Sequence, residues 1–150
     1  MEIYVDGDAC PVKGEIVRVA ERHNTIVYIV SNTVMRLPDS PLVKRIIVGD
    51  GFDAADNWIA DRARKADVVI TSDIPLAHRC VQNEASVLSP TGHSFDAQNI
   101  GNALAMRDLK SVLRESGEIR DHNPSFSKKD RSNFLQQLEL EIRKIKLSEG

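Results

Sequence analysis

Short apolar runs rich in β-branched residues alternate with segments of helical periodicity over the first 90 residues, and this order constrains the fold more than any other feature. Such runs are typical of buried strands, and their alternation with helices predicts βαβ units and a parallel sheet. A chain of 150 residues suits one domain, which can bury about 70% of its unfolded surface. We therefore expect a single α/β domain over residues 1–150, with a central, mainly parallel sheet of about five strands.

The pattern places strands at residues 2–5, 25–30, 45–48, 67–71 and 85–88. It places helices from Pro11 onward and at residues 53–65, 74–82 and 96–115. The stretch 116–130 is then expected to be an ordered crossing or a flexible loop. A last helix, at about 131–146, carries an apolar stripe that is expected to pack on the sheet domain or to form a homo-oligomer. This stripe consists of Leu135, Leu138, Ile142 and Ile145.

Composition excludes several classes of protein. Cys10 and Cys80 lack zinc-ribbon spacing and need no disulfide, which favours a reducing compartment. No apolar run approaches the roughly 18 residues of a membrane span, and the N-terminus has no basic leader with an apolar core. We therefore expect a cytoplasmic protein without a membrane partner. The formal charge of −2 argues against a duplex-coating protein, and the 5% of aromatic residues argues against binding dominated by base stacking.

Acidic residues follow three of the predicted strands. Asp6 and Asp8 come after the first strand, Asp53 and Asp56 after the third, and Asp73 after the fourth. In an open parallel sheet, ligands bind outside the carboxyl ends of the strands, near the point where the strand order reverses. Three separate elements are therefore expected to bring carboxylates to one rim.

Each aspartate also has a structural interpretation. Asp53 and Asp73 stand where a helix N-cap is wanted, and Asp8 could tie the turn before Pro11. Asp56 falls in the first turn of its helix, where the dipole favours an acid, but it could also point over the sheet edge.

Taken together, the carboxylates favour a metal site. Several carboxylates facing one another raise each other's pKa unless a cation lies among them. Mg²⁺ or Mn²⁺ fits such oxygen ligands, and two metals about 4 Å apart could activate a water and neutralise a leaving oxygen. The cluster thus indicates hydrolysis of a phosphodiester.

Basic and amide side chains elsewhere are candidates for phosphate binding. Asn32 and Arg36 lie in the long loop after the second strand and could hold phosphate oxygens, or could only order the loop and face solvent. Lys128 and Arg131 are candidates for a second phosphate contact, although such a run more often marks the solvated start of a helix.

Three blocks of sequence resemble the YaiI/YqxD family of uncharacterised bacterial proteins: residues 6–12, 51–57 and 71–77. The resemblance spans nearly the whole chain and continues through Asn32, Arg36 and Pro90 with Gly92. That family is grouped with PIN-like domains. The resemblance implies a three-layer α/β/α fold and a metal-dependent ribonuclease, with RNA as substrate.

The PIN pattern has an acid at the end of the first strand, another on the helix after the third strand, and a third at the end of the fourth. Asp6, Asp56 and Asp73 match these positions, and Asp8 adds a second carboxylate beside the first. The resemblance implies that these four bind metal, with Asp53 as an outer ligand or a helix cap and a metal-activated water as nucleophile. A fourth PIN acid is often placed farther along, where this chain offers only Asp96 or Asn99.

Two alternatives remain. The pair Asp6 and Asp8, with the acidic motif at residues 49–53, resembles haloacid-dehalogenase-like phosphatases, in which Asp6 would attack phosphorus and Asp8 would act as acid and base. That fold inserts a turn and a hairpin after its first strand, whereas Pro11 predicts a helix almost at once, and Asp73 then has no role. The other alternative is a non-catalytic RNA-binding module.

Overall fold

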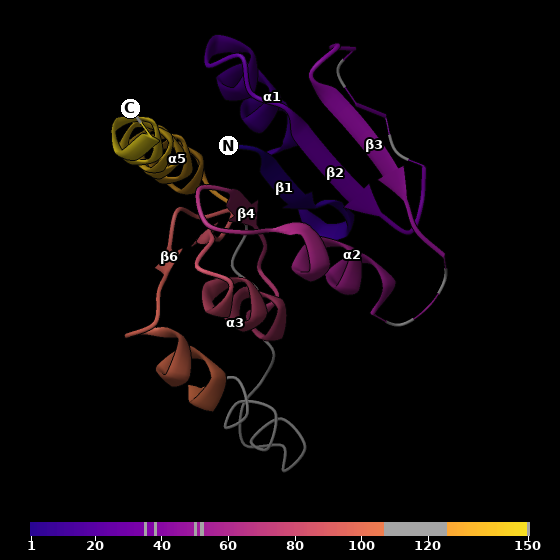
Figure 1. Cartoon of the computed structure of the whole chain (residues 1–150). Coiled ribbons are helices and arrows are strands. Elements are labelled where there is room, and N and C mark those ends of the chain that lie inside the picture. The colour runs from indigo at the N-terminus through magenta and orange to yellow at the C-terminus, as the bar shows by residue number, and fades with distance from the viewer. Residues whose placement is uncertain (35, 38, 50, 52, 107–125, 150) are drawn as a thin grey trace.

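A six-stranded sheet forms the centre of the molecule in the computed structural model, which describes residues 1–34, 36–37, 39–49, 51, 53–106 and 126–149. Its strands lie in the order β3-β2-β1-β4-β5-β6 (Figure 1). Their bounds are Ile3–Asp6 for β1, Val27–Ser31 for β2, Val43–Ile47 for β3, Val68–Ile70 for β4, Ser86–Leu88 for β5 and Ser94–Phe95 for β6. The first five strands are parallel, and β6 runs antiparallel to β5. The predicted α/β class and mainly parallel sheet are confirmed.

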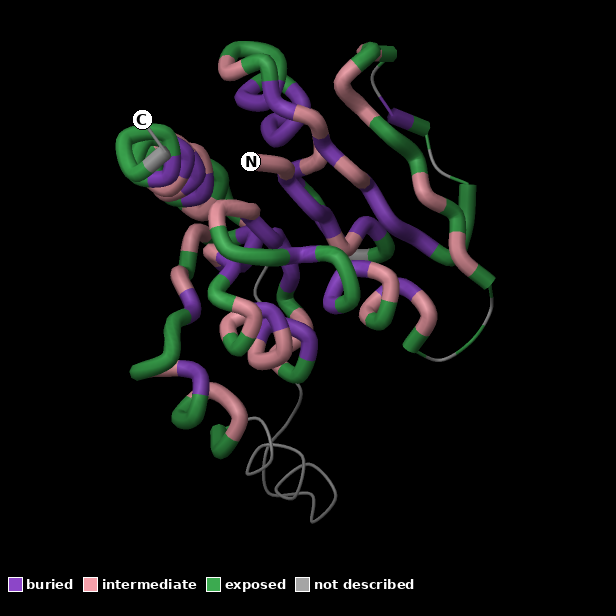
Figure 2. The backbone as a smooth tube through the Cα atoms, viewed as in Figure 1, coloured by how far each residue is buried: buried purple, intermediate pink, exposed green. Residues whose placement is uncertain are grey.

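The central strands are apolar because helices cover both of their faces. Ile3, Val5 and Val69 are all 0% exposed, as expected for a parallel sheet between two helical layers. In contrast, β3 lies at an open edge, and Figure 2 shows it as half-buried and exposed along its length. Lys44 and Arg45 on this strand are exposed, and such charges discourage pairing with another sheet edge.

Two hydrophobic clusters, one on each face of the sheet, make the fold three-layered. The first joins the sheet to α1 (Lys13–Arg22) and α5 (Lys128–Glu149). The second joins it to α2 (Ala54–Arg62) and α3 (Ile74–Gln82), which lie side by side in Figure 1. The residues at 100–106 are also helical, and Ile100 belongs to the second cluster. None of the helices within the described part of the chain is long and apolar enough to cross a membrane.

The last helix packs along α1 and the sheet. Phe134, Leu138 and Ile142 are each 0% exposed in the first cluster, and Nε2 of His23 lies 3.0 Å from Oε2 of Glu139. The helix begins at Lys128 rather than at the predicted 131, because Ser127 and Asp130 form a reciprocal cap. Homo-oligomer formation through this helix stays a prediction.

Two further expectations need correction. The short strand β6 was not predicted, since two residues carry no periodic signal. The helix expected from Asp96 begins at residue 100, because Oδ1 of Asp96 instead accepts hydrogen bonds from the N–H groups of Gln98 and Asn99 in a preceding turn. Residues 107–115 of that predicted helix, and 116–125 of the predicted crossing, lie outside the described residues.

The chain direction across the sheet reverses beside β1. The path runs from β1 outward through β2 to β3, and then returns to β4 on the other side of β1. Between β1 and α1 lie only the short 3₁₀ turn η1 (Gly7–Ala9) and residues 10–12, which leaves no hairpin of the phosphatase kind. The carboxyl ends of β1 and β4 thus form the crevice where ligands bind in open α/β sheets.

Candidate functional site

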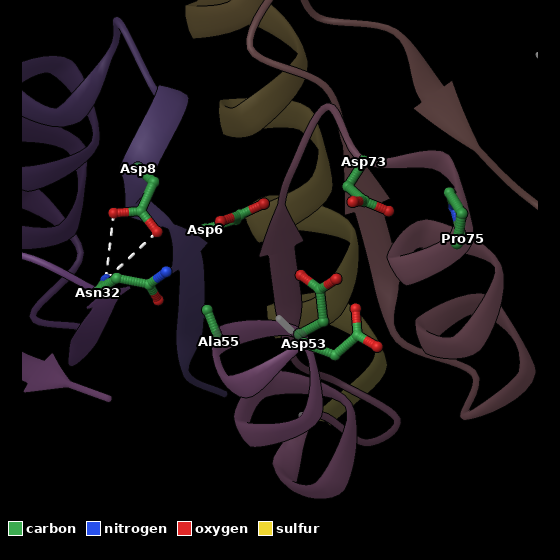
Figure 3. A pocket seen from close by; sticks show the side chains of 8 residues that line it. Asp6, Asp8, Asn32, Asp53, Ala55, Asp73 and Pro75 are labelled. Carbon is green, nitrogen blue, oxygen red and sulfur yellow. Dashed lines mark hydrogen bonds between the residues drawn. The ribbon is translucent and has the colours of Figure 1, made fainter. Parts of the chain in front are cut away.

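A cavity of about 340 Å³ opens at this crevice, at the carboxyl ends of the central strands. Figure 3 shows carboxylates from several different elements arranged around it. Its lining residues are Asp6, Asp8, Asn32, Asp53, Ala55, Asp56, Asp73 and Pro75. The structure therefore brings together all five aspartates that the sequence singles out, together with Asn32.

Asp6 is the last residue of β1, and its orientation is fixed by the neighbouring strand. The hydroxyl of Thr71, just after β4, donates a 3.0 Å hydrogen bond to Oδ2 of Asp6. Burial raises the pKa of the Asp6 carboxyl, and the negative charges of Asp73 and Asp8 raise it further, while the Thr71 hydrogen bond lowers it. Asp6 is thus a half-buried carboxylate whose charge the other aspartates disfavour.

Asp73 both caps a helix and lines the cavity. Its Oδ1 accepts a 3.0 Å hydrogen bond from the N–H of Leu76, which makes it the side-chain N-cap of α3, as predicted. Pro75 in the first turn of α3 is compatible with this start, because a proline there needs no hydrogen-bond partner for its nitrogen. The backbone N–H of Asp73 also donates to the Thr71 hydroxyl at 3.0 Å. One buried hydroxyl therefore links the two acids.

Asp56 shows most clearly that the carboxylates act on one another. It lies in the first turn of α2 and is half-buried. Burial raises its pKa from 3.8 to about 6, with further contributions from the negative charges of Asp73, Asp6 and Asp53. Arg79 of α3 opposes this shift. At neutral pH the cavity thus gathers negative charge that its own side chains do not neutralise.

Asp53 precedes α2 at the N-cap position, but its side chain makes no capping hydrogen bond. This corrects the cap interpretation of Asp53. The side chain is instead exposed and lines the cavity, where Figure 3 shows it on the α2 side. Because the Asp53 carboxylate does not cap α2, it is available to bind a cation.

Asp8 lies on the other side of the cavity, next to β2. Its two carboxylate oxygens accept hydrogen bonds of 3.2 and 3.3 Å from the backbone N–H of Asn32, as drawn in Figure 3. The ammonium of Lys13 donates to the carbonyls of Gly7 and Cys10, at 3.0 and 2.7 Å, and so holds the turn that carries Asp8. Asn32 reaches the cavity as expected.

The other predicted phosphate ligands do not line this cavity. Arg36 is exposed in the loop after β2, and Lys128 is exposed at the start of α5. Nη1 of Arg131 donates a 2.5 Å hydrogen bond to Oε1 of Glu15, and its guanidinium lies 5.4 Å from the centre of the Phe126 ring. Arg131 thus links α5 to α1 through Glu15, and its phosphate contact stays a prediction.

Thr71 was missed as a functional residue by the sequence reasoning. Its role depends on strand pairing, because Ile70 pairs with Val5, so that the residues after them, Thr71 and Asp6, become neighbours. A sequence signal for Thr71 does exist. A hydroxyl residue directly follows one central strand, and an acid ends the strand that pairs with it. Thr71 is 1% exposed, so its hydroxyl must be satisfied internally.

The donor chemistry of the cavity fits a hard divalent cation, since carboxylate oxygens from several elements converge there. Among the residues that the structure describes, however, no three His, Cys, Asp or Glu side chains are close enough together to hold a metal ion as they stand. Metal binding would therefore need Asp53 and Asp56 to turn toward Asp6 and Asp73, which hydrogen bonds hold in place, and it stays a prediction.

Comparison with known proteins gives a family but no activity. The family described as "Uncharacterized BCR, YaiI/YqxD family" matches residues 4–144. A UPF0178 protein of Agrobacterium fabrum is 55% identical over 145 residues, which are 97% of this chain and 95% of the relative. A UPF0178 protein of Rhizobium etli is 54% identical over 148 residues, covering 99% and 96%. No solved structure matches the chain.

Proposed function

The chain belongs to the YaiI/YqxD family, whose description names no reaction, and from its aspartate cavity we propose that it is a divalent-metal-dependent phosphodiesterase that cleaves RNA. The observation that carries the proposal is the convergence of five aspartates on one cavity from three segments of the chain: the end of β1 with η1, the start of α2 and the start of α3. Burial raises the pKa of Asp56, and it is raised further by the negative charges of Asp73 and Asp6, from two other segments of the chain, and of Asp53, just before the same helix. Such a convergence is costly without a cation and is typical of functional sites.

Asp6, Asp8, Asp56 and Asp73 would hold the metal, with Asp53 as an outer ligand. Mg²⁺ and Mn²⁺ both suit oxygen ligands of this kind. Bound there, the metal would supply Lewis acidity toward a phosphate oxygen and a water of lowered pKa. No side-chain nucleophile is required.

The chain's own residues would then orient the reaction. The Thr71 hydroxyl fixes one oxygen of Asp6, and the cap bond to Leu76 fixes one oxygen of Asp73, so neither acid can turn away without losing a hydrogen bond. The Asn32 backbone restrains Asp8 in the same way. The side-chain amide of Asn32, which lines the cavity, would donate a hydrogen bond to a phosphate oxygen.

The choice of RNA rests on the resemblance to PIN-like domains, which are commonly ribonucleases. The resemblance matches Asp6, Asp56 and Asp73 to the three positions of the PIN acids, and the proposal is supported by the fact that all three line one cavity. We propose Mg²⁺ or Mn²⁺ as the cofactor and RNA as the substrate on these grounds.

Melting temperature under titration with MgCl₂ and MnCl₂ tests the metal first. A ligand that binds only the native state must raise the melting temperature. The melting temperature of the wild type should therefore rise with metal concentration, and that of Asp56→Asn and Asp73→Asn should rise less. Asparagine is also a good N-cap, so Asp73→Asn keeps the start of α3. A wild type that shows no metal-dependent shift would sink the proposal.

Activity is tested next, on single-stranded and structured RNAs with MnCl₂ and with EDTA. We expect cleavage that EDTA abolishes and that Asp73→Asn lowers by at least about 100-fold, the scale of losing one transition-state ligand. Metal binding without cleavage of any RNA would favour a non-catalytic RNA-binding module. Trapping of an Asp6 phosphate analogue with beryllofluoride would favour the phosphatase.

A further inference from the structure

A polar cleft lies between α2 and α3, the two helices whose first turns line the aspartate cavity. It has a volume of about 500 Å³. Its lining residues are Ala60, Asp61, Arg64, Arg79, Gln82 and Asn83, and we call it the α2–α3 cleft. Nη1 of Arg79 donates a 2.9 Å hydrogen bond to Oδ1 of Asn57, which joins the two helices beside Asp56.

The cleft lies one helical turn from the aspartate cavity along both α2 and α3. Residues four apart lie on the same face of a helix, about 6 Å apart along its axis. On α2, Asp56 lines the cavity and Ala60 lines the cleft, and on α3 the same holds for Pro75 and Arg79. Each helix therefore leads from the aspartates into the cleft within one turn.

Charge in the cleft has the opposite sign to charge in the cavity. Arg64 and Arg79 bring two guanidinium groups, against the one carboxylate of Asp61. The Arg64 guanidinium is fixed by the carbonyls that end α2, with bonds of 2.9 Å to Ala63 and 2.8 Å to Asp61. A guanidinium has five N–H donors, so Arg79 can bind an anion while it keeps its bond to Asn57.

We propose that the α2–α3 cleft binds the sugar–phosphate backbone of an RNA strand next to the phosphate in the aspartate cavity. The strand would pass from carboxylates that hold metal to guanidinium groups that hold phosphates. The substrate is then a polynucleotide and not a small phosphate ester, a specification that rests on the proposed function. Binding of the strand itself does not depend on cleavage.

Charge variants of Gln82 provide the sharpest test, because this side chain is exposed in the cleft and is not one of the aspartates. Anisotropy of a short, fluorescein-labelled single-stranded RNA in EDTA measures affinity across a salt series. We expect Gln82→Lys to tighten RNA binding, and Gln82→Glu and Arg79→Gln to weaken it, each by about threefold to tenfold. The slope of log affinity against log salt concentration should fall in magnitude by about 0.7 for each phosphate contact that is lost. Arg18→Gln on α1 is the control, since Arg18 is 77% exposed on the other face of the sheet.

If the wild type and both Gln82 variants bind the labelled RNA with equal affinity, the cleft proposal is overturned. DNA of the same sequence should respond to the same variants, since the cleft contacts phosphates. Circular dichroism of Arg79→Gln confirms that a weakened variant is folded.

Hydrolysis of bis(p-nitrophenyl) phosphate separates the two proposals. Gln82→Glu should lower kcat/KM for RNA and leave hydrolysis of the small diester unchanged, because Gln82 is not among the residues that line the aspartate cavity. An equal loss on both substrates would mean that the charge at residue 82 acts on the aspartates, which overturns the cleft proposal. Hydrolysis of the diester without RNA binding also overturns it and leaves the phosphodiesterase standing. RNA binding that follows the Gln82 charge, without hydrolysis of either substrate, supports the cleft and overturns the phosphodiesterase.

Discussion

The hydroxyl of Thr71 joins two acids on adjacent strands: it donates to Oδ2 of Asp6 and accepts from the backbone N–H of Asp73, both at 3.0 Å. Thr71 is 1% exposed, so its hydroxyl depends on these two partners for its hydrogen bonds. The carboxyl ends of β1 and β4 are thereby held at a fixed separation. The geometry of the aspartate cavity thus depends on a residue that does not line it.

Thr71→Val, which keeps the shape of the side chain and removes the hydroxyl, should destabilise the protein by about 1–3 kcal/mol. It leaves a buried N–H unpaired and frees the Asp6 carboxylate to rotate. The melting-temperature response to MnCl₂ should fall as well, and Thr71→Ser should restore much of both. A valine variant with wild-type stability and metal response would contradict this role.

Asp56→Asn should stabilise the metal-free protein above about pH 6. In the folded state the pKa of Asp56 is about 6, whereas the ordinary value is 3.8. The folded protein therefore binds this proton more tightly than the unfolded protein does. The free energy of unfolding falls as the pH rises from about 4 to about 6, and it stays lower above about pH 6. We expect a gain of about 1 kcal/mol at neutral pH, after allowance for solvent screening of a half-buried group.

Urea unfolding in EDTA, at pH values below 4 and above 6, measures this effect. The difference in free energy of unfolding between Asp56→Asn and the wild type should shrink as the pH falls from about 6 to about 4. Asp61→Asn, which removes an exposed carboxylate of the same helix that does not line the cavity, is the matched control. If Asp56→Asn were more stable than the wild type by the same amount at both ends of the pH range, charge repulsion would be ruled out as the cause.

The fold was largely predictable because its signals are local. The predicted bounds of α3, residues 74–82, are those observed, since Asp73 caps the helix and Pro75 suits its first turn. The convergence of the aspartates followed from strand order, which brings the carboxyl ends of β1 and β4 together. The sequence could not tell which acid caps its helix: Asp53 and Asp73 occupy equivalent positions, but only Asp73 makes the bond.

Roles that depend on partners far along the chain were not predictable. Arg131 was a candidate phosphate ligand, yet it pairs with Glu15, which lies 116 residues earlier. The Thr71 bond to Asp6 spans 65 residues and depends on the register of β1 with β4. Only the packed structure fixes such pairs.

Arg131→Met should lower stability by about 1–3 kcal/mol, because Glu15 is 7% exposed and its charge would lose its closest partner. RNA cleavage at temperatures where the variant is folded should stay at the wild-type rate. Lys129→Met, in the same turn of α5, is the control and should change stability by less than about 0.5 kcal/mol. Strong loss of RNA affinity in folded Arg131→Met would support Arg131 as a phosphate ligand.

Gly92→Ala should detach the start of α5 from the loop after β5. Gly92 has φ of +92°, and an added Cβ would lie 2.8 Å from the backbone carbonyl of Asn133. Neither the backbone strain nor the contact can be relieved by a flexible side chain, so we expect a loss of about 2 kcal/mol or more in urea unfolding. Gly14→Ala in α1 is the matched control: a Cβ there meets nothing within 4 Å, and alanine favours a helix, so stability should rise by up to about 1 kcal/mol. If both alanine variants were equally stable, close packing of α5 on Gly92 would not be what holds this helix in place.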